Sequence, residues 1–172
     1  MKIDIGSFCR LTIRARCAFV LFVADSVARE LSGFPELQEL SDASVRMAAQ
    51  WVQGLHVEPD ALNRLLLDVN DEGLFAHIDT RYPKASDRAL TVVSGAICYV
   101  AWHAYAVAGQ VMPEGIEDAS EDYVQWVIDS AVPSPRFDEA KSWKFLETMQ
   151  GRHSVDKEGE LGSPIGFDEI AL

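Results

Sequence analysis

The segment from Asp68 to Asp79 carries oxygen ligands at the spacing of a calcium-binding loop. On a twelve-residue loop, Asp68, Asn70 and Glu72 take positions one, three and five, and Gly73 takes position six, where the chain must turn sharply. The pattern departs from that loop twice, because the glutamate at position five is long and the aspartate at position twelve is too short for the usual bidentate contact. We therefore interpret the segment as a polar turn between two helices, with calcium binding as the alternative.

The densest group of carboxylates lies between residues 114 and 122 and comprises Glu114, Glu117, Asp118, Glu121 and Asp122. Acidic side chains in a first helical turn complement the positive end of the helix dipole. This accounts for the last three members but not for Glu114 and Glu117, which precede the expected helix. The cluster is therefore a candidate docking site for Lys and Arg side chains of a partner protein.

A second acidic set flanks an earlier expected helix and has the same interpretation. It comprises Glu58, Asp60, Asp68, Asp71 and Glu72. From this set we predict Asp68, Asp71 and Glu72 as further partner-binding residues.

No other side chains form a recognisable catalytic or metal-binding pattern. The four histidines show no ligand spacing with one another or with cysteine, and there is no nucleophile elbow, phosphate-binding glycine loop or zinc-type His-Glu-x-x-His. We expect no catalytic residue, no metal site and no cofactor, and we expect His103 to be a hydrogen-bonded core histidine. Cys9, Cys17 and Cys98 are an odd number without a C-x-x-C pair, which favours reduced thiols in a cytosol.

The apolar spacing predicts an all-α protein. Helices are expected over residues 8–31, 41–53, 59–69, 74–82, 87–109, 119–131 and 137–150. Ser41 is the expected N-cap of the second, and Asp118-x-x-Glu121 resembles a capping box for the sixth. The four tryptophans (Trp51, Trp102, Trp126 and Trp143) lie in apolar stripes and are expected in the core. The predicted architecture is a single-domain bundle of about six helices over residues 1–151, around a buried central helix. A flexible, poorly ordered acidic tail over residues 152–172 is expected to follow it.

Net charge limits the classes of partner. The chain has 27 Asp and Glu against 15 Lys and Arg, a formal charge of −12. Five basic and three acidic residues lie in residues 1–32, so the acidity belongs to the rest of the chain. Such a surface repels nucleic acid and anionic membrane and attracts cationic proteins. Ala89–Val111 has no charged residue and is long enough to span a bilayer at about 1.5 Å per residue. Its small and polar residues favour a buried helix instead, and no clear secretion signal precedes it, so we expect a cytoplasmic protein.

From Met47 to Val132 the chain resembles a family of bacterial immunity proteins that protect cells from polymorphic toxins. The residues that carry the resemblance are Trp51-Val52, Leu62–Asp68, Asp71-Glu72-Gly73-Leu74, Ala96–Ala106, Pro113-x-x-Ile116-Glu117 and Glu121-Asp122. The resemblance implies a non-enzymatic inhibitor that binds a cognate toxin domain and blocks its active site or its access to substrate.

Our leading hypothesis is therefore a cytosolic immunity protein that neutralises a basic toxin without catalysis, with the cluster at residues 114–122 as its first-choice interface. Two alternatives remain open: a helical adaptor or regulatory protein-binding module, and a small carboxylate-dependent hydrolase. A toxin encoded beside the gene would favour the immunity protein over the adaptor, and bound divalent metal would favour the hydrolase.

Overall fold

The computed structural model describes residues 1–67, 73–78 and 82–170. Its helices are α1 (Ile5–Cys9), α2 (Ile13–Ala28), the 3-10 helix η1 (Arg29–Leu31), α3 (Pro35–Val52), α4 (Pro59–Leu66), the 3-10 helix η2 (Leu74–His77), α5 (Lys84–Ala108), α6 (Tyr123–Ala131), α7 (Glu139–His153) and α8 (Phe167–Ile170). The described ranges contain no β-strand, only one isolated bridge between Leu11 and Ser154. The predicted all-α class is confirmed.

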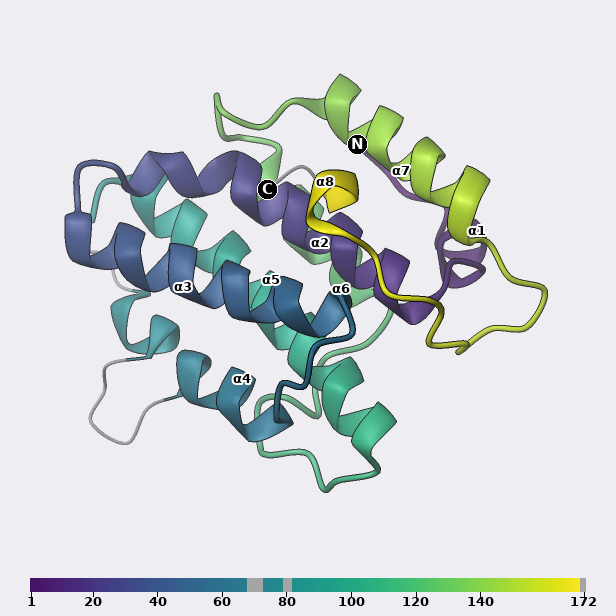
Figure 1. Ribbon diagram of the computed structural model, residues 1–172. Helices are drawn as coiled ribbons and strands as arrows, with labels where there is room; N and C mark the ends of the chain where they lie inside the picture. The colour runs from purple at the N-terminus through teal and green to yellow at the C-terminus, as the bar shows by residue number, and fades with distance from the viewer. Residues whose placement is uncertain (68–72, 79–81, 171–172) are drawn as a thin grey trace.

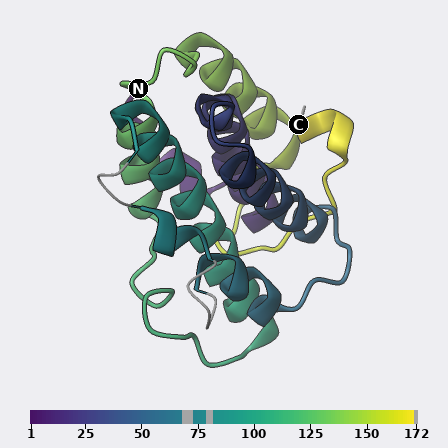
Figure 2. The same ribbon diagram turned by 90° about the vertical axis from the view of Figure 1, so that its left-hand side faces the viewer.

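Helix α5 is the centre of the fold, as its uniformly apolar sequence predicts. It contacts α2, α3, α4 and α6. Figures 1 and 2 place α3 and α6 on opposite sides of it. The helix ends at Gly109, whose φ of 64° is left-handed, and the N–H of Gln110 donates to the carbonyl of Tyr105. Glycine accepts this conformation without a Cβ penalty, so the chain turns out of the core into the loop that carries the acidic cluster.

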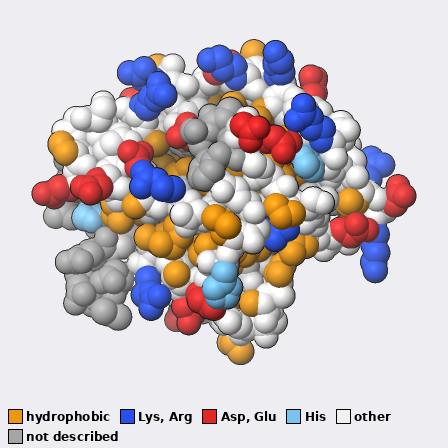
Figure 3. Space-filling view, in the orientation of Figure 1, with side chains coloured by type: hydrophobic (Ala, Val, Ile, Leu, Met, Phe, Trp, Pro, Cys, Tyr) orange, Lys and Arg blue, Asp and Glu red, His pale blue; other side chains and the backbone are white. Residues whose placement is uncertain are grey.

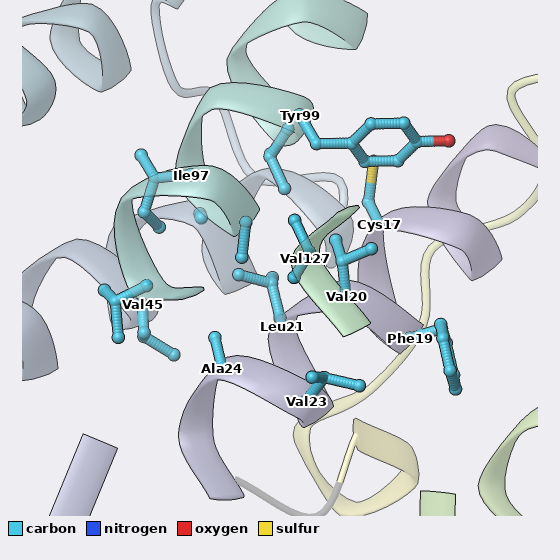
Figure 4. Packing of buried hydrophobic residues seen from close by; sticks show 14 of the residues in the cluster. Cys17, Phe19, Val20, Leu21, Val23, Ala24, Val45, Ile97, Tyr99 and Val127 are labelled. Atoms are coloured by element: carbon cyan, nitrogen blue, oxygen red, sulfur yellow. The ribbon is translucent and has the colours of Figure 1, made fainter. Parts of the chain in front are cut away.

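The core lies where α2 packs on α5 (Figure 4). Helix α2 is itself buried along most of its length, from Ala15 to Ala28. The aromatic ring of Tyr99 on α5 lies over the thiol of Cys17 on α2. On the opposite side of α2, Phe22 stacks on Phe145 of α7 with ring centroids 4.4 Å apart. The interior is therefore made of one central helix pair covered by the other helices.

The predicted starts of the first and second helices were wrong. The expected helix over 8–31 is broken at residues 10–12, and Thr12 caps α2 by accepting a hydrogen bond from the N–H of Ala15. The second helix begins at Pro35 and not at Ser41, which is fully buried inside α3. Proline lacks the N–H that a first helical turn leaves unpaired, so Pro35 starts a helix here and does not end one.

The C-terminal segment lies against the helical body, which differs from the poorly ordered tail that its composition predicts. The N–H groups of Ile13 and Arg14 donate to the carbonyls of Glu160 and Leu161. Ile165 and Ile170 are fully buried in the hydrophobic core. The difference arises because a few well-placed apolar side chains and backbone hydrogen bonds can dock a segment whose average composition is polar.

Helix α5 is the one helix in the described part of the chain that is long and apolar enough to cross a membrane. In this fold, 78% of its most apolar window is buried inside the protein. The central helix is thus buried by other helices, as the sequence predicts.

Candidate functional site

The acidic loop, residues 109–122, joins α5 to α6 and presents four exposed carboxylates. They belong to Glu114, Glu117, Asp118 and Asp122. The loop is held from below by Ile116, which is fully buried, and by turn hydrogen bonds from the N–H groups of Ile116 and Glu117 to the carbonyl of Pro113. Because Ile116 is buried in the core, the neighbouring carboxylates face solvent at a defined place.

Glu121 belongs to the same predicted cluster but turns inward. Its Oε1 pairs with Nη1 of Arg16, and its Oε2 accepts a hydrogen bond from the Tyr99 hydroxyl at 2.5 Å. The expected capping box is therefore absent, and α6 begins at Tyr123 and not at residue 119. The Glu121 carboxylate neutralises a guanidinium that is only 3% exposed, because a buried charge without a partner is strongly unfavourable.

Burial controls the ionisation of the groups around this ion pair. The pKa of His103 falls from 6.5 to about 3, first because burial disfavours the charged ring and second because Arg16 lies nearby. Its Nε2 is 3.6 Å from Glu121 Oε1 and makes no hydrogen bond, so the predicted core histidine is buried but unpaired at this atom. Burial also raises the pKa of the Tyr99 hydroxyl and of the Cys17 thiol well above their ordinary values. Both groups stay neutral at physiological pH.

Sequence reasoning missed this buried polar cluster, which we define as Arg16, Tyr99, His103 and Glu121. The signal that points to it is Arg16, a charged residue on a helix whose other faces are apolar. A guanidinium in that position requires an acidic partner from elsewhere in the fold. The partner comes from 105 residues further along the chain, which no local pattern reveals.

The second predicted acidic set is only partly covered by the structure. Glu58 is exposed, with an oxygen 2.7 Å from Nε2 of His56, and Asp60 accepts a 2.5 Å hydrogen bond from the Tyr105 hydroxyl. Asp68, Asp71 and Glu72 lie outside the described residues, and so does half of the possible calcium loop from Asp68 to Asp79. Within the described ranges, no group of three or more His, Cys, Asp or Glu side chains is arranged to hold a metal ion.

Two tryptophans that were expected in the core are exposed. Trp51 is buried, whereas Trp126 on α6 is 44% exposed and Trp143 on α7 is 36% exposed. An apolar stripe on a short outer helix does not specify which of its edges meets the core. Figure 3 shows a further apolar surface on the face formed by α3 and α4, where hydrophobic side chains gather between charged groups. The turn between those helices carries Leu55, which is 55% exposed.

The fold and the site together define a small all-α protein with an acidic docking surface. The surface is a loop of exposed carboxylates, held in place by a buried ion pair. The model of the family described as "Immunity protein Imm6" matches residues 15–133, which is more than half of the chain. The chain therefore belongs to the Imm6 immunity protein family. No curated protein and no solved structure matches it.

Family membership confirms the resemblance and extends it. The match begins at residue 15, so it includes α2 with Arg16 and is not restricted to the region from Met47 onwards. It also includes the acidic loop and α6, and it ends before α7. Membership implies that the protein neutralises a cognate toxin, and inhibitors of this kind typically act without catalysis.

Proposed function

We propose that this protein binds a basic, cytosol-acting toxin domain through the acidic loop and blocks it without catalysis. The observation that carries the proposal is the exposure of Glu114, Glu117, Asp118 and Asp122 on one loop of a family member whose formal charge is −12. Carboxylates at this density attract a cationic surface over distances of about 10 Å at moderate salt. The toxin would meet the inhibitor in the cytoplasm.

The loop is suited to docking because the side chains that anchor it are not the ones that present charge to solvent. Ile116 and Glu121 face inward and hold the backbone, and the remaining carboxylates have no described ion-pair partner within the protein. A docking toxin therefore does not have to break an internal salt bridge before it pairs with them. Electrostatic attraction of this kind acts chiefly on the association rate, and it weakens as ionic strength rises.

The first experiment is to purify the tagged protein from its native bacterium at low salt and to identify the co-eluting proteins. A stoichiometric basic protein encoded beside this gene, released by salt, is the expected result. Elution of the protein alone, from cells that make the neighbouring gene product, would contradict the proposal. Cells should then be tested for protection against that same toxin.

Charge reversal tests the loop itself. The variant Glu114→Lys/Glu117→Lys should slow association with the toxin about tenfold or more at low salt and much less at high salt. Glu121 is not changed, because a lysine there would face the buried Arg16 and would test folding instead of binding. The matched control is Glu39→Lys/Glu147→Lys, which makes the same change of net charge at exposed positions on α3 and α7. If both variants slow association equally, the effect arises from the net charge of the protein and not from the loop.

A further inference from the structure

The outer face of α6 continues the acidic loop and carries a tryptophan between two carboxylates. Asp122, Trp126 and Asp129 are spaced by four and three residues, so they lie on the same side of the helix. Asp122 has helical backbone angles, so the helical spacing includes it. Both aspartates are exposed, and Trp126 is 44% exposed. The α6 face, defined by these three residues, therefore combines one large aromatic surface with two negative charges.

The indole of Trp126 is held rigidly by the helix beneath it. A Cβ added at Gly95 of α5 would lie 2.7 Å from Cζ3 of Trp126, so the ring rests directly on the glycine backbone. Tyr123 supports it from the side, with ring centroids 4.9 Å apart. A fixed, half-exposed aromatic ring loses little conformational entropy when a partner covers it.

The position of Asp129 is also fixed from within the fold. Its Oδ1 accepts a 2.7 Å hydrogen bond from the amide of Gln125. The same Gln125 side chain accepts from the N–H of Ile3 and donates to the carbonyl of Met1. Gln125 thus orients the carboxylate beside the tryptophan and leaves its second oxygen for a partner.

We propose that the α6 face is the anchor of the toxin interface, where Trp126 receives an arginine side chain of the toxin and the two aspartates pair with its charge. This inference rests on the proposed function and names the chemistry of the contact. A guanidinium stacks on an indole face and forms hydrogen bonds to carboxylates at its edge, so one arginine satisfies both features of the surface. Tryptophan and arginine are the residues that most often dominate binding energy at protein interfaces.

The second exposed tryptophan provides an internal comparison. Trp143 is exposed to a similar extent, and the exposed Glu139 and Glu147 lie on its side of α7 at four-residue spacing. It also lies outside the residues matched by the immunity family, whereas the whole α6 face lies inside them. Trp143 therefore offers a similar aromatic and acidic surface outside the family region, and a toxin contact specific to α6 should leave it without effect.

The test compares Trp126→Ala, Trp126→Phe and Trp143→Ala in the full chain, by calorimetric titration with the purified toxin domain encoded beside this gene. Trp126→Ala should weaken binding about thirty-fold or more, Trp126→Phe should fall between it and the wild type, and Trp143→Ala should change binding by less than about two-fold. Circular dichroism melting of each variant checks that the helices remain intact.

A second pair of variants keeps the test valid if Trp126→Ala fails to fold. Asp122→Asn/Asp129→Asn changes only exposed side chains and should weaken binding about tenfold, whereas Glu147→Gln/Asp156→Asn should not. If Trp126→Ala and Asp122→Asn/Asp129→Asn both bind the toxin as tightly as the wild type does, the inference is overturned while the proposed function stands. Loss of binding in Leu55→Asp alone would move the interface to the face formed by α3 and α4. A wild-type protein that neither binds the toxin domain nor protects cells would overturn the proposed function and the anchor together.

Discussion

Arg16 and Glu121 form an ion pair that joins α2 to the end of the acidic loop across 105 residues of sequence. The arginine side chain is 3% exposed and the glutamate side chain 26% exposed, so the pair lies at the edge of the core. The same carboxylate accepts the Tyr99 hydroxyl of α5. One side chain of the loop is therefore connected to both helices of the central pair, and the loop's exposed carboxylates keep their place as a result.

Removal of the Glu121 carboxylate should destabilise the protein strongly. Glu121→Ala leaves the buried guanidinium of Arg16 without its partner, and we expect the free energy of unfolding to fall by about 3–5 kcal/mol. In an Arg16→Met background there is no guanidinium to leave unpaired, and the same substitution should cost only about 1–3 kcal/mol, for the Tyr99 hydroxyl that loses its acceptor. Urea unfolding of the wild type, Glu121→Ala, Arg16→Met and the double variant measures both costs. Equal costs in the two backgrounds would show that the pair is not coupled.

His103 should make the protein less stable in acid. Its pKa is 6.5 in the unfolded chain and about 3 in the folded protein, so only the unfolded state binds a proton between these values. The free energy of unfolding therefore falls as pH decreases from 6.5 towards 3, by up to about 1.4 kcal/mol per pH unit from this group. His103→Gln should reduce that slope in urea unfolding measured at several pH values across the window. An unchanged slope would assign the acid sensitivity to carboxylates alone.

A methyl group at Gly95 should displace the tryptophan of the α6 face. The Cβ would lie 2.7 Å from Trp126 and 3.0 Å from Cγ2 of Val127, so Gly95→Ala should lower the free energy of unfolding by about 1–3 kcal/mol. It should also shift the tryptophan fluorescence. Gly151→Ala is the matched control, because this helical glycine has nothing within 4 Å of the added atom. Alanine there should be neutral or stabilising by up to about 1 kcal/mol.

The docked C-terminal segment should contribute to stability through Ile165. This side chain is fully buried, and the N–H of Ile165 donates to the carbonyl of Val52 at 3.3 Å. Ile165→Ala should lower the free energy of unfolding by about 2–5 kcal/mol, because it removes apolar contacts and leaves a cavity. Ser163→Ala, two residues earlier and exposed, should change it by less than about 0.5 kcal/mol. A thermal melt in which the two variants behave alike would indicate that the segment is not docked in solution.

Apolar periodicity was sufficient to predict the long elements of this fold. The absence of charge from Ala89 to Val111 predicts a central buried helix because only a helix surrounded by others can be apolar on every side. Helix ends were less predictable. Pro35 and Gly33 are compatible with either the end of one helix or the start of the next, and the break at residues 10–12 depends on contacts with residues beyond 150.

The candidate site was likewise predicted only in part from the sequence. Local sequence identifies the acidic cluster and predicts exposed carboxylates for a cationic partner, a role in binding that stays a prediction. It does not separate Glu121 from Glu117 or Asp118, because all are acidic residues in one loop and their directions depend on what lies beneath them. Likewise, it does not separate Trp126 from Trp51, since a stripe on a helix shows its apolar side but not how much of that side a neighbour covers.

The sequence by itself determined the helical class, the buried central helix and the position of the acidic loop, because these depend on composition and on spacing within about four residues. Only the tertiary structure decided that Glu121 neutralises Arg16, that Ile165 returns to the core and that Trp126 rests on Gly95 with its indole open to solvent. Each of these contacts joins residues far apart in the chain. The energy of such a contact depends on burial and distance in the folded protein, which no local pattern encodes.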